Sequence, residues 1–173
     1  MTTPASVEAD LGWALGTVMR TYLHTSQEAL VGVPGGPRGY LVLAASKGGE
    51  PSSQLALAQR LGVDRTVMTY LLDDLEGAGL VERKPDPADR RARRIVLTEP
   101  GRALLCELER RLRAAEDHVL EPLEPAERDT LRALLHRLAT GTAGDGTSPC
   151  SVADEIQAMD AVEPPPARAR RKR

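Results

Sequence analysis

The chain has 173 residues, of which 41% are hydrophobic and 28% charged, and its formal net charge at pH 7 is −2. That length suits one domain with its own core, and the composition is that of a globular protein. No apolar run approaches the roughly 18–20 residues that span a bilayer, and no signal peptide is evident. We therefore expect a cytoplasmic protein with no membrane contact. Its single Trp, three Tyr and absence of Phe predict a core of Leu, Val and Ala between helices.

The N-terminal part predicts one long helix and one short helix. Residues 6–30 form the long one, because apolar residues recur at steps of three and four: Leu11, Leu15, Val18, Met19, Tyr22 and Leu23. The Gly- and Pro-rich segment 31–39 ends this helix. The short helix is "YLVLAAS".

Two compact helices with clear start and stop signals follow. Ser53 stands at the N-cap position of "QLALAQRLG", which closes at Gly62. Asp64 can cap the next helix, "RTVMTYLLDDLEGAG", which stops at Gly77 and Gly79. Four side chains of that second helix should face inward: Val67, Leu71, Leu72 and Leu75.

A basic hairpin comes next. Two β-like runs, Leu80–Arg83 and Ile95–Leu97, flank a loop that holds Pro85 and Pro87. From residue 83 to 94 there are six basic and two acidic residues, a local net charge of +4 in an acidic protein. Such a run is often only a solvated loop. Placed directly after two capped helices joined by a tight turn, it instead predicts the wing of a DNA-binding winged helix-turn-helix.

The remaining sequence predicts two helices and a tail. Thr98 caps a helix over 99–121, and a last helix covers 125–139. Their apolar stripes, with that of 6–30, exceed what the small lobe can cover and indicate a partner chain. Residues 141–173 are Gly-, Ser- and Pro-rich, which predicts a disordered tail with an exposed Cys150 and little effect on the melting temperature. The tail ends in a basic cluster, either a weak phosphate-binding arm or a solubility feature: Arg168, Arg170, Arg171, Lys172 and Arg173.

The residues that carry catalysis or bind metals show no suitable grouping. The three His and two Cys lack metal-ligand spacing. There is no phosphate-binding Gly loop, no Ser/His/Asp grouping and no paired carboxylates in an apolar context. We therefore expect no enzyme, no metal and no cofactor. A winged-helix dimer that binds protein in place of DNA stays open as an alternative, because Asp73 and Asp74 put negative charge on the second short helix.

Residues 55–105 resemble the DNA-binding lobe of MarR-type transcriptional regulators, most specifically in "GLVERKPDPADRRARRIVLTEPG". The "LVER" strand, the Asp-x-Arg of Asp89 to Arg91 and the "LTE-x-G" helix start match the family wing in spacing. The resemblance implies a mainly α fold with a small β-hairpin wing over residues 1–140. In it, 38–98 would form the DNA-binding lobe, and 6–30 with 99–139 the dimerisation helices. It also implies a ligand-responsive homodimer, a repressor on a pseudo-palindromic operator in double-stranded DNA.

The same resemblance assigns DNA-contacting residues. Arg91 would enter the minor groove with Asp89 orienting it, and Arg90, Arg93 and Arg94 would lie near phosphates. The second short helix would present five residues to the bases, with Arg65 the candidate for guanine: Asp64, Arg65, Thr66, Thr69 and Tyr70. Ser53 and Gln54 would donate to phosphate.

Family members often respond to small phenolic or amphipathic ligands, bound between the dimer helices and the DNA lobe. Six residues are candidates for such a crevice here: Trp13, Met19, Tyr22, His24, Arg38 and Tyr40. Packing in the core or in the dimer is the alternative role for Trp13 and Tyr22.

Overall fold

The computed structural model of the chain describes residues 10–47, 53–86, 93–142, 148 and 150. Within these residues the predicted fold class is confirmed, with helices and one two-stranded antiparallel hairpin. The elements in chain order are α1 (Leu11–Ala29), α2 (Gly36–Ala45), α3 (Gln54–Leu61), α4 (Arg65–Gly77), β1 (Val81–Pro85), β2 (Arg93–Leu97), α5 (Glu99–Val119) and α6 (Pro125–Thr142).

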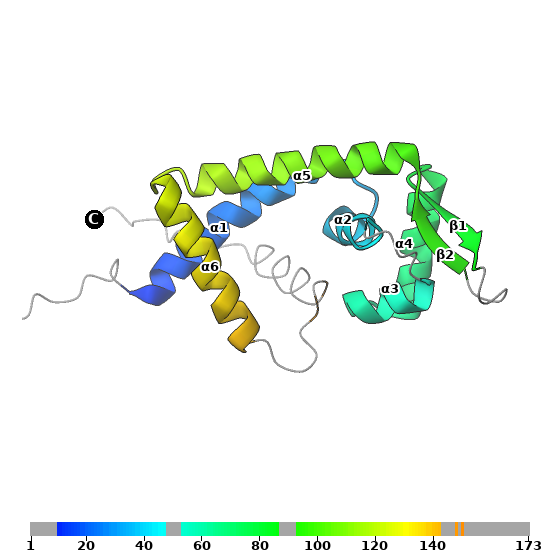
Figure 1. The fold of residues 1–173 in the computed structure, drawn as a ribbon, viewed down its shortest axis with the longest axis horizontal. Coiled ribbons are helices and arrows are strands. Elements are labelled where there is room, and N and C mark those ends of the chain that lie inside the picture. The colour runs from blue at the N-terminus through cyan, green and yellow to red at the C-terminus, as the bar shows by residue number, and fades with distance from the viewer. Residues whose placement is uncertain (1–9, 48–52, 87–92, 143–147, 149, 151–173) are drawn as a thin grey trace, which may run out of the picture.

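The long helix α5 joins two parts of the molecule (Figure 1). At its N-terminal end it adjoins a lobe made of α2, α3, α4 and the hairpin. Toward its C-terminal end it packs along α1, and α6 turns away from it beyond a short loop. None of the helices in the described part of the chain combines the length and the hydrophobicity that crossing a bilayer requires.

The predicted helix caps are confirmed. Ser53 Oγ accepts from the Ala56 amide at 3.1 Å, Asp64 Oδ1 from the Thr66 amide at 2.7 Å, and Thr98 Oγ1 from the Gly101 amide at 3.1 Å. Each bond satisfies a backbone donor that the helix start leaves free. Gly62 closes α3 in the left-handed conformation, with φ of +67°, which suits a residue without a side chain.

The core of the lobe is aliphatic, as predicted, and every element of the lobe contributes to it. One assignment was wrong: Val67 was expected to face inward but is 39% exposed, and Met68 is fully buried in its place. The buried stripe of α4 runs through residues 68, 71, 72 and 75. This i, i+3, i+4, i+7 pattern is a regular helical face, and residue 67 lies beside it.

The hairpin is slightly longer than the sequence runs suggested. Its register pairs Val81 with Leu97 and Pro85 with Arg93. Ser53 makes an isolated bridge with Arg94, so the chain entering α3 lies beside β2. Gly101, the glycine of "LTE-x-G", allows α5 to begin close to the hairpin, because a β-carbon there would overlap the carbonyl of Leu80. The motif glycine is therefore a packing requirement.

The helices outside the lobe expose their apolar stripes in the single chain. Leu15, Val18 and Met19 on α1 are exposed, as are Leu134, Leu135 and Leu138 on α6. None of the described side chains of α6 is buried. The expectation that the lobe cannot cover these stripes is confirmed for α1 and α6. It was wrong for the helix 99–121, because Leu108 and Ala115 of α5 are buried within the single chain.

The C-terminal part of the chain departs from expectation in two respects. The predicted start of the first helix, at residue 6, lies outside the described residues, and α6 extends past residue 139 to Thr142. Of the predicted tail, the structure describes Gly141, Thr142, Ser148 and Cys150. The expected exposure of Cys150 was wrong, since its side chain is buried in the lobe core. Composition could not show this, because one small apolar side chain can be buried within an otherwise polar segment.

Candidate nucleic-acid interface

The face of α4 that points away from the core carries polar side chains. Arg65, Thr66 and Tyr70 are exposed, Tyr70 by 66%. Arg65 stands at the first turn of the helix and makes no ion pair with any carboxylate in the described ranges. An exposed guanidinium at the start of a recognition helix has the donors that read the O6 and N7 atoms of guanine. This face has the chemistry of base readout.

The side chain of Asp64 caps the start of α4 rather than contributing to its exposed polar face. Its carboxylate accepts from the Thr66 amide at 2.7 Å and the Val67 amide at 3.4 Å. These two hydrogen bonds lower the pKa of the Asp64 carboxyl, so it stays ionised at the N-terminus of α4. The position predicted for Asp64 as a base-facing residue is therefore at the edge of the interface, with its carboxylate engaged in capping.

Gln54 and Thr69, both predicted to contact DNA, are bonded to each other. Gln54 Nε2 donates to Thr69 Oγ1 at 2.7 Å, and Thr69 Oγ1 donates to the carbonyl of Arg65 at 2.9 Å. Both side chains are half-buried between α3 and α4. The pair fixes the angle between the two helices, and Ser53 beside it caps α3. The structure thus brings Ser53, Gln54 and Thr69 together at the base of the recognition helix.

Sequence reasoning missed Arg83 as a functional residue. Its guanidinium donates to Asp73 Oδ1 at 2.7 Å, to the Glu76 carboxylate, and to the Thr69 carbonyl at 3.3 Å. Its own amide also donates to Glu76 Oε1 at 3.0 Å. Partial burial opposes the charge, but the bonds to Asp73 and then Glu76 raise the pKa of Arg83. The i, i+3 spacing of the two acids, which places them on one helix face, was the available signal.

These contacts explain one of the two adjacent acidic residues on α4, Asp73 and Asp74. Asp73 is neutralised by Arg83, which is only 20% exposed. Asp73 and Asp74 are both exposed, but Asp74 has no basic partner among the described residues. The negative charge of these two residues was the reason to consider a protein-binding module as an alternative function. Part of that charge instead bonds the wing to the recognition helix.

Most of the basic residues in the described parts of the wing already have acidic partners. Lys84 pairs with Glu82 at 2.6 Å. Arg94 lies 2.9 Å from Asp86, close enough for an ion pair although the atoms are not aligned as a hydrogen bond. Arg93 is exposed and pairs with no carboxylate of the described chain.

Among the described residues of the wing, Arg93 is therefore the cation without an acidic partner. The predicted contacts Asp89, Arg90 and Arg91 lie outside the described residues. Their roles stay predictions.

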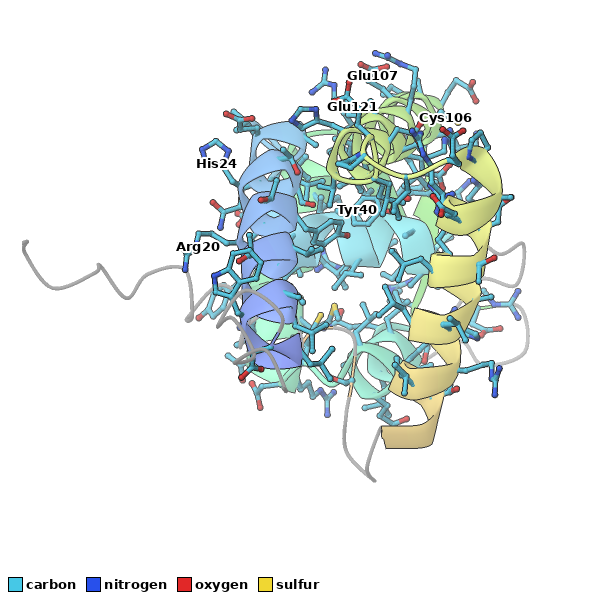
Figure 2. The ribbon with its side chains drawn as sticks, turned by 90° about the vertical axis from the view of Figure 1, so that its left-hand side faces the viewer. Arg20, His24, Tyr40, Cys106, Glu107 and Glu121 are labelled. Carbon is cyan, nitrogen blue, oxygen red and sulfur yellow. The ribbon has the colours of Figure 1, made fainter. Side chains whose placement is uncertain are left out.

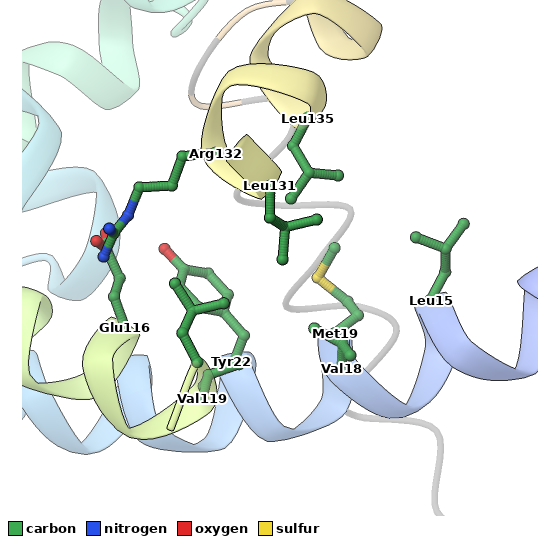
Figure 3. Close-up of a pocket in the computed structure, with 10 residues that line it drawn as sticks. Leu15, Val18, Met19, Tyr22, Glu116, Val119, Leu131, Arg132 and Leu135 are labelled. Carbon is green, nitrogen blue, oxygen red and sulfur yellow. The ribbon is translucent and has the colours of Figure 1, made fainter. Parts of the chain in front are cut away.

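The residues predicted for a small ligand divide into two groups. Met19 and Tyr22 line an apolar pocket of about 450 Å³ between α1, the end of α5 and α6. Figure 3 shows both side chains pointing toward Leu131 of α6, with Glu116 and Arg132 at one end of the pocket. Trp13, His24, Arg38 and Tyr40 are not part of its lining.

Tyr40 and His24 lie on different sides of this region. Figure 2 shows Tyr40 beneath α5 in the space between α1 and α6, whereas His24 points outward. Burial raises the pKa of the Tyr40 hydroxyl, and the nearby Glu109, Tyr22 and Glu116 raise it further. His24 instead lies 3.8 Å from Glu28 on its own helix. In the described part of the chain, no three His, Cys, Asp or Glu side chains lie together so that they could hold a metal ion.

Comparison with known proteins gives a consistent assignment. A family model described as MarR family matches residues 37–92. A MarR-family transcriptional regulator from Rhodococcus sp. RHA1 is 30% identical, with a TM-score of 0.62, over 81% of this chain and 99% of that one. CouR from Rhodococcus jostii RHA1, bound to p-coumaroyl-CoA, is 31% identical, with a TM-score of 0.61, over 82% of this chain and 99% of its own.

A second CouR structure connects this fold to DNA. The transcriptional repressor CouR bound to a 23-mer DNA duplex is 28% identical, with a TM-score of 0.63, and the match covers 80% of this chain and 99% of that one. The fold of this chain is therefore shared with solved regulators over nearly their whole length. The chain belongs to the MarR family of winged-helix transcriptional regulators.

Proposed function

We propose that the chain is a ligand-responsive homodimeric repressor that binds a pseudo-palindromic operator in double-stranded DNA. The observation that carries this proposal is the lobe itself. One exposed helix face, with Arg65 and Tyr70, lies beside a wing on which Arg93 is a cation with no acidic partner among the described residues. The match to CouR, a repressor bound to a DNA duplex, supports the same conclusion.

On the operator, α4 would lie in the major groove and the wing along the backbone toward the minor groove. Arg65 would donate to guanine, and Tyr70 would contact neighbouring bases or the sugar edge. Arg93, with Arg90 and Arg91 beyond it, would neutralise phosphates or enter the minor groove, with Asp89 orienting Arg91. Ser53, Gln54 and Thr69 would hold the start of α3 near phosphate. Arg94, which has Asp86 beside it, would add less.

A second copy of the chain would cover the apolar faces of α1 and α6. The described part of α6 buries none of its side chains, and Leu138 is 62% exposed. Exposed apolar surface of this extent indicates a protein partner. A two-fold dimer through α1, α5 and α6 would space two recognition helices for half-sites about one helical turn apart. Residues 6–30 and 99–139 would then form the dimerisation part, and 38–98 the DNA-binding lobe.

The effector would bind where the dimerisation part meets the lobe, near Tyr22 and Tyr40. The two tyrosines come from α1 and α2, and Glu116 of α5 is close to both. An apolar crevice with a few polar groups suits an aromatic or amphipathic ligand. CouR, which resembles this chain, was solved with p-coumaroyl-CoA, an aromatic acyl thioester. Such a ligand would release DNA if it bound better to a dimer with misspaced recognition helices.

The test is to measure mass and DNA binding together. Light scattering after gel filtration gives the oligomeric state, and fluorescence anisotropy with duplexes from the region upstream of the coding sequence gives affinity over a salt series. We expect a dimer whose affinity falls steeply with salt. A monomer, or a dimer that ignores all duplexes at low salt, would reject the proposal. The second outcome would favour the protein-binding alternative.

A further inference from the structure

Two described residues beyond α6, Ser148 and Cys150, lie against the DNA-binding lobe. Cys150 is 1% exposed and belongs to the lobe core, with residues of α2, α3, α4, the hairpin and α5. The other cysteine, Cys106, is exposed on α5. The described side chains of α6, which precede this segment, include none that is buried. Cys150 is therefore more deeply buried than any described side chain of α6.

Ser148 marks the place on the lobe where this segment lies. A β-carbon built on Gly62 would overlap both Oγ and Cβ of Ser148. Gly62 is the residue that ends α3, and Asp64, two residues later, caps α4. The Ser148 side chain thus lies on the turn of the helix-turn-helix, on the connection that sets the angle between its two helices.

We propose that Ser148 and Cys150 form a C-terminal latch, in which these two residues hold the helix-turn-helix turn and the core of their own lobe. The latch goes beyond the proposed function and does not depend on DNA binding. The chains solved for the MarR-family regulator and CouR match 81% and 82% of this chain over 99% of their own lengths. Part of this chain thus has no counterpart in them.

Thiol reactivity in the full-length protein tests the burial of Cys150. In Cys106→Ser, Cys150 is the sole thiol, and its reaction with a disulfide reagent should be at least about 100-fold slower in the native protein than in urea, because access requires local opening. Cys150→Ser leaves Cys106 and should react fast in both conditions. A Cys150 that reacts equally fast with and without urea would overturn the proposal.

Two glycines provide a matched pair that tests the seat of the latch. Gly62 and Gly79 have similar positive φ, +67° and +70°, but a β-carbon on Gly79 meets nothing within 4 Å. In the Cys106→Ser background, Gly62→Ala should therefore speed the reaction of Cys150 by at least about tenfold, since it displaces Ser148 and favours the open form. Gly79→Ala, with the same backbone strain, should not. Adding Ser148→Gly to Gly62→Ala removes the two overlapping atoms and should restore protection. Equal protection of Cys150 in the two alanine variants would overturn the proposal.

Truncations give an independent readout. A chain that stops after Ala153 keeps the latch and loses the basic cluster of 168–173, whereas a chain that stops after Thr142 loses both. The shorter chain should melt at least about 3 °C lower than the longer one, because the lobe loses a core residue and its turn is released. Identical melting temperatures for the two truncations would count against the latch.

Discussion

Arg83 donates to Asp73 at 2.7 Å, so the first strand of the wing is bonded directly to the recognition helix. Glu76, one turn further along α4, accepts from both the side chain and the amide of the same arginine. The wing and the helix therefore move as one body. This coupling matters for DNA binding, because the two elements must reach adjacent grooves of one duplex at the same time.

Replacing Arg83 with Ala should lower both stability and DNA affinity. The guanidinium is 20% exposed and its acidic partners are about half-exposed, so the free energy of unfolding should fall by about 1–2 kcal/mol. Operator binding should weaken too, although Arg83 would touch no DNA. Urea unfolding and anisotropy measure the two effects. Lys84→Ala is the control, since its exposed pair with Glu82 should contribute less than about 0.5 kcal/mol. Equal losses of stability and DNA affinity in Arg83→Ala and Lys84→Ala would show that the bonds of Arg83 to α4 contribute no more than an exposed ion pair.

Removing a cation of the wing should weaken DNA binding more when that cation has no acidic partner in the protein. Arg91→Ala should weaken operator binding by about 1–3 kcal/mol and leave the dimer intact. Arg93→Ala should reduce the slope of log affinity against log salt by about 1. Arg94→Ala should change that slope less, because Asp86 already lies 2.9 Å from its guanidinium. If Arg94→Ala has the larger effect, the ion pair with Asp86 opens on DNA.

The order and type of the elements could be read from the sequence because their signals are local. Helix starts can be predicted from N-cap side chains alone, because capping involves only neighbouring residues, here Ser53, Asp64 and Thr98. The wing was predicted for a similar reason, since β-branched runs and a basic loop follow directly on α4.

Pairings between distant residues could not be predicted in the same way. Arg83 was counted only as one of the six basic residues of the wing, because only the fold brings it to Asp73 and Glu76. Cys150 looked exposed because its neighbours are polar. Val67 and Met68 were exchanged because adjacent apolar residues on a helix differ by about 100° and either could begin the stripe. In each case the deciding contact joins residues that local patterns treat separately.

Acid should destabilise the protein partly through α5. Glu107 accepts from Arg110 and Arg111, and these bonds, that to Arg110 first, lower its pKa from 4.5 to about 2. A folded-state pKa below the unfolded value means that the stabilisation is complete above pH 4.5 and is lost as the pH falls toward 2. Between pH 5 and 2, the melting temperature of Glu107→Gln should therefore fall less steeply with decreasing pH than that of the parent chain. Equal slopes for the two proteins would show that the ion pairs persist in the unfolded state or are too weak to affect stability.

A charge placed on α6 should separate the proposed dimer without unfolding the chain. Leu135 lines the pocket between α1 and α6 and is exposed in the single chain, so Leu135→Glu costs the monomer little. In a dimer the same carboxylate would be buried without a partner, which should raise the dimer dissociation constant at least about 100-fold. Light scattering over a dilution series measures this constant, and circular dichroism checks the fold. Val31→Glu is the matched control, because Val31 is exposed in the loop after α1, away from the pocket.

The DNA affinity of Leu135→Glu should fall together with its dimer content, since a monomer can occupy only one half-site. A Leu135→Glu variant that stays dimeric at nanomolar concentration would place the interface on another face.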